Sequence, residues 1–238
     1  MNIAVIQARG GSKRIPGKNI KNFLGRPIIE YSLQAALSCG DIFDKVIVTT
    51  DSEKIAKIAE KAGAEIPFMR PAKLADDYTN TWEVVLHAIE ECEKIYSVKI
   101  ANICCLYATA PFLRNCDISS GYKLLTGRQV SSVFSVTTFP FPIFRGLKIS
   151  DDGHLEMFWP EHELTRSNDL PEAYHDAGQF YWLDAQKFKQ DKKMYGKDAL
   201  PVILPRILVQ DIDTQEDWET AEVLYEACRK RGLLNGNC

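Results

Sequence analysis

The sequence predicts an α/β protein with a doubly wound, mixed sheet. Short apolar runs alternate with segments whose apolar residues recur at helical spacing, and this order is typical of a sheet with helices on both faces. The runs end in glycine-rich or polar loops, where open α/β sheets bind ligands. With 238 residues the chain can bury a full core. We therefore expect one domain over residues 1–238, with an inserted excursion at residues 140–176.

The first four elements follow from apolar spacing and from end signals. Continuous apolar runs predict strands at Ile3–Ile6 and Lys45–Thr50, because a strand buried on both faces has no polar alternation. We expect helices over 27–40 and 52–62. A proline opens the first, a serine can cap the second, and a glycine ends each of them.

Five elements are expected in the middle of the chain. They are a weak strand at 64–69, a helix over 81–94, a strand at Lys99–Tyr107, a helix over 117–127 and a β-rich run at Ser131–Phe139. Asn80 and Glu83 have the spacing of a capping box, and Asp117 is expected to cap the later helix. Lys99–Tyr107 is the strongest apolar run, so we place it at the sheet centre, with Ala108–Pro111 as a ligand loop.

The regular alternation stops at residues 140–176. Prolines and an Asp-Asp-Gly turn indicate an excursion out of the sheet, and we expect it to serve as an oligomer contact or a lid. The chain then returns with apolar runs at Gly178–Leu183 and Val202–Val209. Thr214 is expected to cap the last helix, whose first turn is acidic and after which Gly232 follows.

The loop after the first strand is cationic and rich in glycine. Arg9, Lys13, Arg14 and Lys18 surround the Gly10-Gly11 pair, and such a loop suits a polyphosphate. It lacks the glycine spacing of the P-loop and of the dinucleotide fingerprint. The alternative is a basic surface turn with no ligand.

Two further groups of polar residues are candidates for chemistry. Asp211 and Asp213 stand between the last strand and the last helix, where two carboxylates can hold Mg²⁺ or can simply favour the helix dipole. Arg70, Asp77 and Thr81 can bind a phosphate or the edge of a base. The alternative is that they only form the hydrogen bonds of an ordinary loop and helix cap.

A third group is Arg166 with the run 174–179. His175 and Asp176 are neighbours in an extended segment, so their side chains point to opposite faces and a direct relay is not expected. One of them can still reach a substrate hydroxyl.

The composition argues against several classes of protein. The net charge of −3 argues against a nucleic-acid binder. The seven cysteines and four histidines lack zinc spacing, and we expect the cysteines to be reduced core residues. No apolar stretch has the length of a signal peptide or a membrane span, so we expect a cytoplasmic protein with no membrane partner.

Four motifs together resemble a known family. They are QARGGSKRIPGKN near the start, RPAKLADDYTNT, YHDAGQFYW, and QDIDTQEDW near the end. They resemble the cytidylyltransferases that activate nonulosonic (sialic-type) acids, above all the pseudaminic acid branch, over nearly the whole chain. The resemblance implies a mononucleotide-binding, GT-A-like nucleotidyltransferase fold. It also implies CTP as donor, Mg²⁺ as the required ion and a homodimer built through the excursion.

The resemblance assigns roles to individual residues. Around the nucleotide it implies Ala8, Arg9, Gly10, Gly11, Ser12, Lys13, Lys18, Asn19, Arg70, Asp77 and Thr81. Arg9 and Lys13 are implied to be catalytic, together with the metal-binding acids Asp211 and Asp213. Around the sugar acid it implies Tyr107, Thr109, Arg145, Arg166, Tyr174, His175 and Gln179. The sialic acid enzymes tend to carry a glutamine before Pro-Thr where this chain has Tyr107-Ala108-Thr109, and Arg-Pro-Asn-Gly where it has 175–178. The identity of the sugar acid therefore stays open.

The implied reaction is attack of the sugar's anomeric hydroxyl on the α-phosphate of CTP. Mg²⁺ at the acidic pair and the cations of the first loop would stabilise the charge that moves onto pyrophosphate. The alternatives are the same chemistry on sialic, legionaminic or octulosonic acid, a sugar-nucleotide-dependent glycosyltransferase, and a non-catalytic nucleotide-binding module. A glycosyltransferase would place its acidic pair in mid-chain, and a non-catalytic module would not explain the carboxylates.

Overall fold

A six-stranded mixed sheet forms the centre of the molecule. The structure is a computed structural model and describes residues 1–234. The strand order is β10-β6-β9-β5-β1-β4, and the strands are β1 Asn2–Gln7, β4 Lys45–Thr49, β5 Asn102–Tyr107, β6 Ser132–Thr138, β9 Tyr174–Asp184 and β10 Leu200–Ile203. All neighbours are parallel except β9, which runs antiparallel to both β5 and β6. The expected mixed sheet and the central place of β5 are confirmed.

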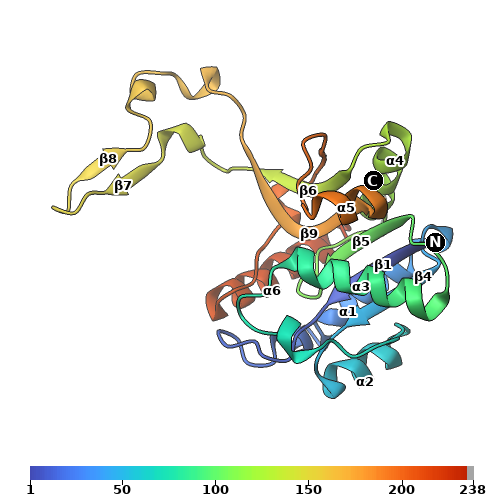
Figure 1. Ribbon diagram of the computed structural model, residues 1–238. Helices are drawn as coiled ribbons and strands as arrows, with labels where there is room; N and C mark the ends of the chain where they lie inside the picture. The colour runs from blue at the N-terminus through green and yellow to red at the C-terminus, as the bar shows by residue number, and fades with distance from the viewer. Residues whose placement is uncertain (235–238) are drawn as a thin grey trace.

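Helices cover both faces of this sheet (Figure 1). They are α1 Ile29–Leu37, α2 Glu53–Lys61, α3 Thr81–Tyr96, α4 Asn115–Arg128, α5 Ala185–Asp191 and α6 Gln215–Lys230. Alternate residues of β1 enter different cores, because successive strand side chains point to opposite faces. Ile6 packs in the core that contains residues of α1, α2 and α4, whereas Val5 packs in the core that contains residues of α3 and α5. The doubly wound architecture is therefore confirmed.

A third core joins the two ends of the described chain. Phe23 lies between Tyr31, Trp218 and Tyr225, with ring centroids 5.4 to 5.6 Å from each of them. Phe23 belongs to the short hairpin of β2 Asn22–Phe23 and β3 Arg26–Pro27, which follows the first loop. Trp218 is in α6, so this core fixes the start of α6 beside the first loop.

Short 3-10 turns supply most of the remaining regular structure. Their bounds are Lys18–Ile20, Gly40–Ile42, Ala72–Leu74, Ile143–Arg145, Pro160–His162, Ser167–Asp169 and Arg206–Leu208. The last of them corrects the expectation of an apolar run from Val202 to Val209. The strand stops at Ile203, because Pro205 has no amide proton to continue the ladder.

Several element boundaries differ from expectation. The helix expected over 27–40 is α1, Ile29–Leu37, because Pro27 is paired in β3 and Gly40 begins a 3-10 turn. The weak strand at 64–69 is wrong: only Glu65 bridges to β4, and Pro67 cannot extend the pairing. Asp117 is not the cap of α4, which begins at Asn115 after Arg114 and ends at Arg128 rather than Gly127. The Asp117 carboxylate instead accepts from the Arg114 guanidinium at 2.7 Å within the first turn.

The excursion leaves the sheet after β6 and rejoins it at β9. The segment between these two strands projects away from the body of the molecule (Figure 1). Its tip is the hairpin of β7 Leu147–Ile149 and β8 Leu155–Met157. Its base is closed by a hydrogen bond from Phe139 N to Ala173 O at 3.2 Å. Residues 174–176 belong to β9, so the excursion is shorter than the expected 140–176.

Five cysteines are buried free thiols, as expected: Cys39, Cys92, Cys104, Cys105 and Cys228. Cys116 corrects that expectation because it takes part in a disulfide bond. Cys238 lies outside the described residues. Among the helices of residues 1–234, none has the length and apolar character needed to cross a bilayer.

Candidate active site

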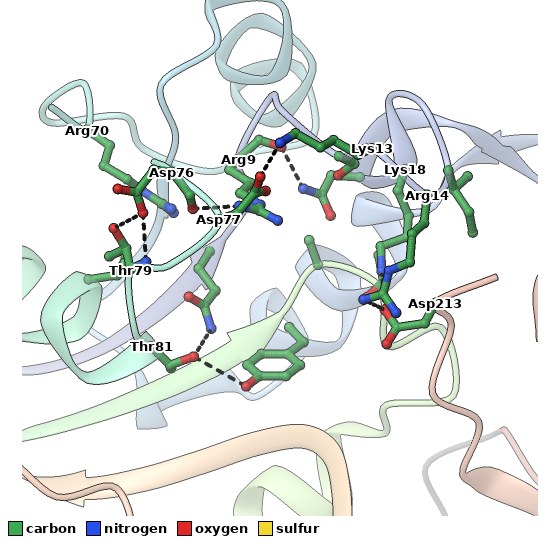
Figure 2. A pocket seen from close by; sticks show the side chains of 18 of the residues that line it. Arg9, Lys13, Arg14, Lys18, Arg70, Asp76, Asp77, Thr79, Thr81 and Asp213 are labelled. Carbon is green, nitrogen blue, oxygen red and sulfur yellow. Dashed lines mark hydrogen bonds and ion pairs between the residues drawn. The ribbon is translucent and has the colours of Figure 1, made fainter. Parts of the chain in front are cut away.

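The site is a cavity of about 290 Å³ at the carboxyl ends of β1 and β5, where α/β sheets bind ligands. The loop after β1 forms one wall, and the segment before α3 forms another (Figure 2). Nineteen residues line it: Gln7, Arg9, Ser12, Lys13, Arg14, Ile15, Lys18, Asn19, Arg70, Leu74, Asp76, Asp77, Thr79, Thr81, Val84, Tyr107, Ala108, Thr109 and Asp213.

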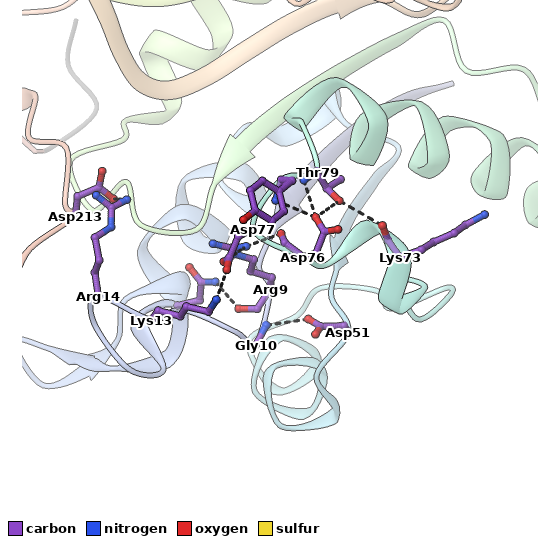
Figure 3. Close-up of polar contacts among 12 residues, drawn as sticks. Arg9, Gly10, Lys13, Arg14, Asp51, Lys73, Asp76, Asp77, Thr79 and Asp213 are labelled. Atoms are coloured by element: carbon purple, nitrogen blue, oxygen red, sulfur yellow. Dashed lines mark hydrogen bonds and ion pairs between the residues drawn. The ribbon is translucent and has the colours of Figure 1, made fainter.

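Two cations of the first loop converge on Asp77. Arg9 Nη1 lies 2.9 Å from Asp77 Oδ1 and 2.5 Å from the Asp76 carbonyl oxygen, and Lys13 Nζ is bonded to Asp77 Oδ2 (Figure 3). The hydrogen bond from Lys13 is the main cause that lowers the pKa of Asp77, and the Arg9 charge adds to it. Asp77 therefore stays ionised and holds the two cations together.

The other two cations converge on Asp213. Arg14 Nη2 lies 2.9 Å and Lys18 Nζ 3.1 Å from Asp213 Oδ1, and Lys18 also donates to the Ile212 carbonyl oxygen at 2.5 Å. Figure 2 shows this group across the cavity from Asp77. Burial raises the pKa of the neighbouring Asp211, and the charge of Asp213 raises it further.

The backbone of the first loop is held from beneath. Gly10 N donates to Asp51 Oδ1 at 2.8 Å, and a Cβ at Gly10 would lie 3.1 Å from Ser52 Cβ, so this position favours glycine. The buried Asn19 side chain donates to the Arg9 carbonyl oxygen at 2.9 Å. Ala8 N pairs with Thr49 O at 3.1 Å. These bonds fix the direction in which Arg9 leaves the sheet.

The cavity floor carries a buried guanidinium and a line of hydroxyls. Arg70 is 6% exposed and donates to Thr49 Oγ1 and Thr49 O, at 3.2 and 2.6 Å, and burial lowers its pKa to about 10. Thr81 Oγ1 lies 3.4 Å both from Gln7 Nε2 and from the Tyr107 hydroxyl. Arg70 and Thr81 thus lie in one cavity with the first loop.

A family described as "Cytidylyltransferase" matches residues 3–235 of the sequence. The chain belongs to the cytidylyltransferase family.

Named relatives agree with this assignment, and a solved structure shares the fold. The pseudaminic acid cytidylyltransferase of Campylobacter jejuni is 42% identical over 228 residues, which are 94% of this chain and 96% of the relative. The CMP-N,N'-diacetyllegionaminic acid synthase of Legionella pneumophila is 30% identical, over 94% and 96% of the two chains. A CMP:2-keto-3-deoxy-manno-octonic acid synthetase complexed with CTP shares the fold, with a TM-score of 0.67, 15% identity, and 95% and 98% of the chains covered.

The cytidylyltransferase site brings together most of the residues that were expected around the nucleotide. Arg9, Ser12, Lys13, Lys18, Asn19, Arg70, Asp77 and Thr81 line the cavity, as do Tyr107 and Thr109 of the expected sugar group. Ala8, Gly10 and Gly11 belong to the backbone of the loop, and Asp211 stands beside the lining residue Asp213.

Five residues of the expected sugar group do not line this cavity. Arg145 donates to the Thr165 carbonyl oxygen at 2.7 Å, and Arg166 pairs with Asp169 at 2.6 Å, both within the excursion. Tyr174 OH donates to Glu172, and the His175 ring lies 2.9 Å from the Asp176 carbonyl oxygen, not from its carboxylate. Gln179 is 3% exposed and donates to Leu208 O. Their roles toward a sugar stay predictions.

The sequence reading missed several lining residues of this cytidylyltransferase. Gln7 ends an apolar strand, and its polar type at a strand end was the available signal. Arg14 was visible as part of the basic loop, but its partner Asp213 was not. Asp76 accepts from Thr79 N at 2.7 Å and thereby shapes the turn that carries Asp77.

The acidic pair fits Mg²⁺ by its chemistry. Within residues 1–234, no group of three or more His, Cys, Asp or Glu side chains is arranged to hold a metal. Mg²⁺, however, is commonly bound through one or two carboxylates plus waters and substrate phosphates. Asp213 already gathers two cations, and the charges of Asp211 and Asp213 repel each other. A divalent cation between them would relieve that repulsion.

Proposed function

We propose that this cytidylyltransferase transfers CMP from CTP to a nonulosonic acid, with pseudaminic acid as the preferred acceptor, and releases pyrophosphate. The observation that carries the proposal is the division of four cations into two groups across one cavity, each gathered by a single carboxylate. The 42% identity to the Campylobacter jejuni enzyme named for pseudaminic acid supports the choice of acceptor.

The cations would bind the triphosphate where carboxylates hold them now. Arg9 and Lys13 meet at Asp77, so a phosphate that replaces this carboxylate would receive donors from both side chains. The anomeric hydroxyl of the acceptor would then attack the α-phosphate, and the bond to the β-phosphate would break. Arg9 and Lys13 would stabilise the negative charge that develops on the leaving pyrophosphate.

Asp211 and Asp213 would hold Mg²⁺, which when bound neutralises phosphate charge and orients the phosphates. Arg14 and Lys18 keep the Asp213 carboxylate in place at the cavity edge. Lys18 also holds the backbone between the two acids through Ile212 O. These contacts position the pair before any ligand arrives.

The excursion would pair two copies of the chain. Ile149 and Leu155 face each other across the β7–β8 hairpin and are 74% and 69% exposed. The opposite face of the hairpin carries the Lys148–Glu156 ion pair at 3.1 Å. An amphipathic hairpin with an uncovered apolar face is typical of an interface between chains, and we propose a homodimer.

One assay tests the reaction. The protein is incubated with CTP, Mg²⁺ and separately with pseudaminic, N-acetylneuraminic, legionaminic and octulosonic acids, and pyrophosphate and the CMP-sugar are measured. We expect the highest kcat/KM with pseudaminic acid. Lys13→Ala should lower kcat by about a hundredfold or more, as loss of a preorganised electrostatic group does.

Lys123→Ala is the matched control, because Lys123 is exposed on α4 and does not line the cavity, and it should keep the wild-type rate. Turnover with none of the four acids would contradict the proposed function. A clear preference for another acid would contradict the choice of pseudaminic acid alone.

A further inference from the structure

Asp176 forms a polar cluster with two tyrosines behind the cavity. Its Oδ2 accepts from the hydroxyls of Tyr181 and Tyr195, at 2.6 and 2.5 Å, and its Oδ1 accepts from Gly178 N at 2.8 Å. Tyr181 is 3% exposed, so its hydroxyl depends on this partner. None of these side chains lines the cavity, and the reaction proposed above does not use them.

An irregularity of β9 brings the cluster together. Tyr181 pairs with Phe134 of β6, whereas Asp176 pairs with Val136, so four residues of β9 lie opposite the single residue Ser135 of β6. Gly178 supplies the left-handed backbone that this bulge requires, with φ of 61°. The bulge therefore brings Tyr181 within hydrogen-bond distance of the Asp176 carboxylate, which regular pairing would keep apart. Bulges of this kind commonly re-aim side chains beside active sites.

The cluster contacts the cavity through Tyr107. The rings of Tyr107 and Tyr181 lie 5.5 Å apart, and burial raises the pKa of Tyr107, while its hydrogen bond with Thr81 acts against that rise. Tyr107 and Thr81 both line the cavity. Asp176 is thus connected to the cavity by its hydrogen bond from Tyr181, by the contact of the Tyr181 and Tyr107 rings, and by the approach of the Tyr107 hydroxyl to Thr81.

Asp176 fixes the directions of two tyrosine hydroxyl groups. An ionised carboxylate accepts but cannot donate, so Tyr181 and Tyr195 each direct their single hydroxyl proton to it. These bonds hold the Tyr181 ring, which packs against the ring of Tyr107. A carboxylate outside the cavity lining thereby supports a residue that lines it.

We propose that Asp176 is a positioning residue that acts through Tyr181 to orient Tyr107 toward the acceptor, and so helps to select the acceptor acid. This inference rests on the proposed function, because it assumes that Tyr107 meets the acceptor rather than CTP. It adds Asp176, Tyr181 and Tyr195 to the determinants of specificity.

The kinetic test compares Asp176→Asn, Tyr181→Phe and Tyr107→Phe. An amide at position 176 donates as well as accepts, so it no longer fixes the direction of both hydroxyls. We expect the KM for the acceptor to rise about tenfold, the effect of losing one hydrogen bond to a charged group. The KM for CTP should change less than about twofold.

A double variant separates positioning from general damage. If Asp176 acts through Tyr107, Asp176→Asn should have no further effect on the acceptor KM in a Tyr107→Phe background. Additive effects, or an equal rise in the KM for CTP, would overturn the proposal. Tyr96→Phe is the matched control, because the Tyr96 hydroxyl also donates to a carboxylate, Glu65 Oε2 at 2.9 Å, away from the cavity.

A measurement without substrate keeps the inference independent of turnover. In protein labelled with ¹³Cζ-tyrosine, the Tyr107 resonance should shift in Asp176→Asn and stay unchanged in Tyr96→Phe. Tyr195→Phe, which removes one donor at an exposed residue, should give a smaller shift of the same kind if the main variant folds poorly. An unchanged Tyr107 resonance would overturn the proposal even if an acceptor turns over. If the Tyr107 resonance shifts but none of the four acids is turned over, the proposed function is refuted, whereas the link between Asp176 and Tyr107 is supported.

Discussion

Each of the four cations of the first loop has a carboxylate partner. Arg9 and Lys13 share Asp77, and Arg14 and Lys18 share Asp213. Such pairing holds long side chains near the positions where they would act, which lowers the reorganisation that binding requires. A phosphate must therefore compete with Asp77 for its donors, so part of its attraction to the loop is used in separating existing pairs.

The raised pKa of Asp211 leads to a prediction about stability. Burial and the Asp213 charge raise this pKa in the folded protein. The folded state then binds the proton more tightly than the unfolded state, so stability falls as pH rises through the raised pKa. At neutral pH, Asp211→Asn should raise the Tm by about 1 °C, since a partly exposed charge contributes at most about 0.5 kcal/mol.

Thermal unfolding of the metal-free protein across pH measures this effect. The gain from Asp211→Asn should shrink as the pH falls through the raised pKa of Asp211, and it should vanish below the ordinary pKa of an aspartate, where the carboxyl is neutral in both states. Asp41→Asn serves as the control, because Asp41 is exposed on a short turn outside the cavity. A lower Tm for Asp211→Asn at neutral pH would contradict the statement that the Asp211 charge is disfavoured in the folded protein.

Among the elements, α6 has the most direct connection to the acidic pair. Its N-cap Thr214 immediately follows Asp213, and Asp217 Oδ2 accepts from both Asp213 N and Thr214 N, at 3.0 and 2.7 Å. Trp218, one residue later, is anchored in the third core. The cap therefore fixes the backbone that presents the two acids.

Thr214→Ala should lower both stability and Mg²⁺ affinity. Loss of an N-cap costs about 1 kcal/mol, which is about 2–4 °C in Tm for a domain of this size. The Mg²⁺ concentration that gives half-maximal activity should rise, because the backbone at Asp213 loses its support. Thr126→Ala is a suitable comparison: its hydroxyl bonds Tyr122 O inside α4 and caps nothing. Equal changes in the two variants would argue against a role for the cap.

The periodicity of apolar residues was sufficient to predict the long helices and strands, but it was insufficient to predict where they begin and end. The apolar runs of β1, β4 and β5 and the capping pairs of α3 and α6 are local signals, and the structure contains them. Asp117 was misread because a carboxylate at a helix start suits either a cap or an ion pair, and Arg114 supplies the pair. The β9 bulge has no local signal apart from Gly178.

At the scale of the whole molecule, the excursion carries the prediction of a dimer. Ile149→Lys should give a monomer in sedimentation velocity at a concentration where the wild type is a dimer, because it would place a charge in the proposed apolar contact between the two chains. Lys148→Gln, on the opposite face of the hairpin, should leave the dimer intact. A wild-type protein that is monomeric at micromolar concentration would refute the proposed dimer.

The ion pairs of the cavity also depend on the fold of the whole molecule. The cationic loop and the acidic pair were each visible as motifs, but Lys13 and Asp77 are 64 residues apart, and Lys18 and Asp213 are 195 apart. Which cation meets which carboxylate is decided by the sheet order and the third core. No spacing rule within the sequence contains that information.

The closed base of the excursion makes this part of the chain an exchangeable module. Phe139 and Ala173 are hydrogen-bonded across the point where the segment leaves and re-enters, so a short turn could join β6 to β9 as an ordinary hairpin. The entropy of closing a loop grows slowly with its length, so long or short insertions at this base are tolerated almost equally. The projection could therefore lengthen, shorten or be replaced by another sequence during evolution without disturbing the register of the sheet beneath the cavity.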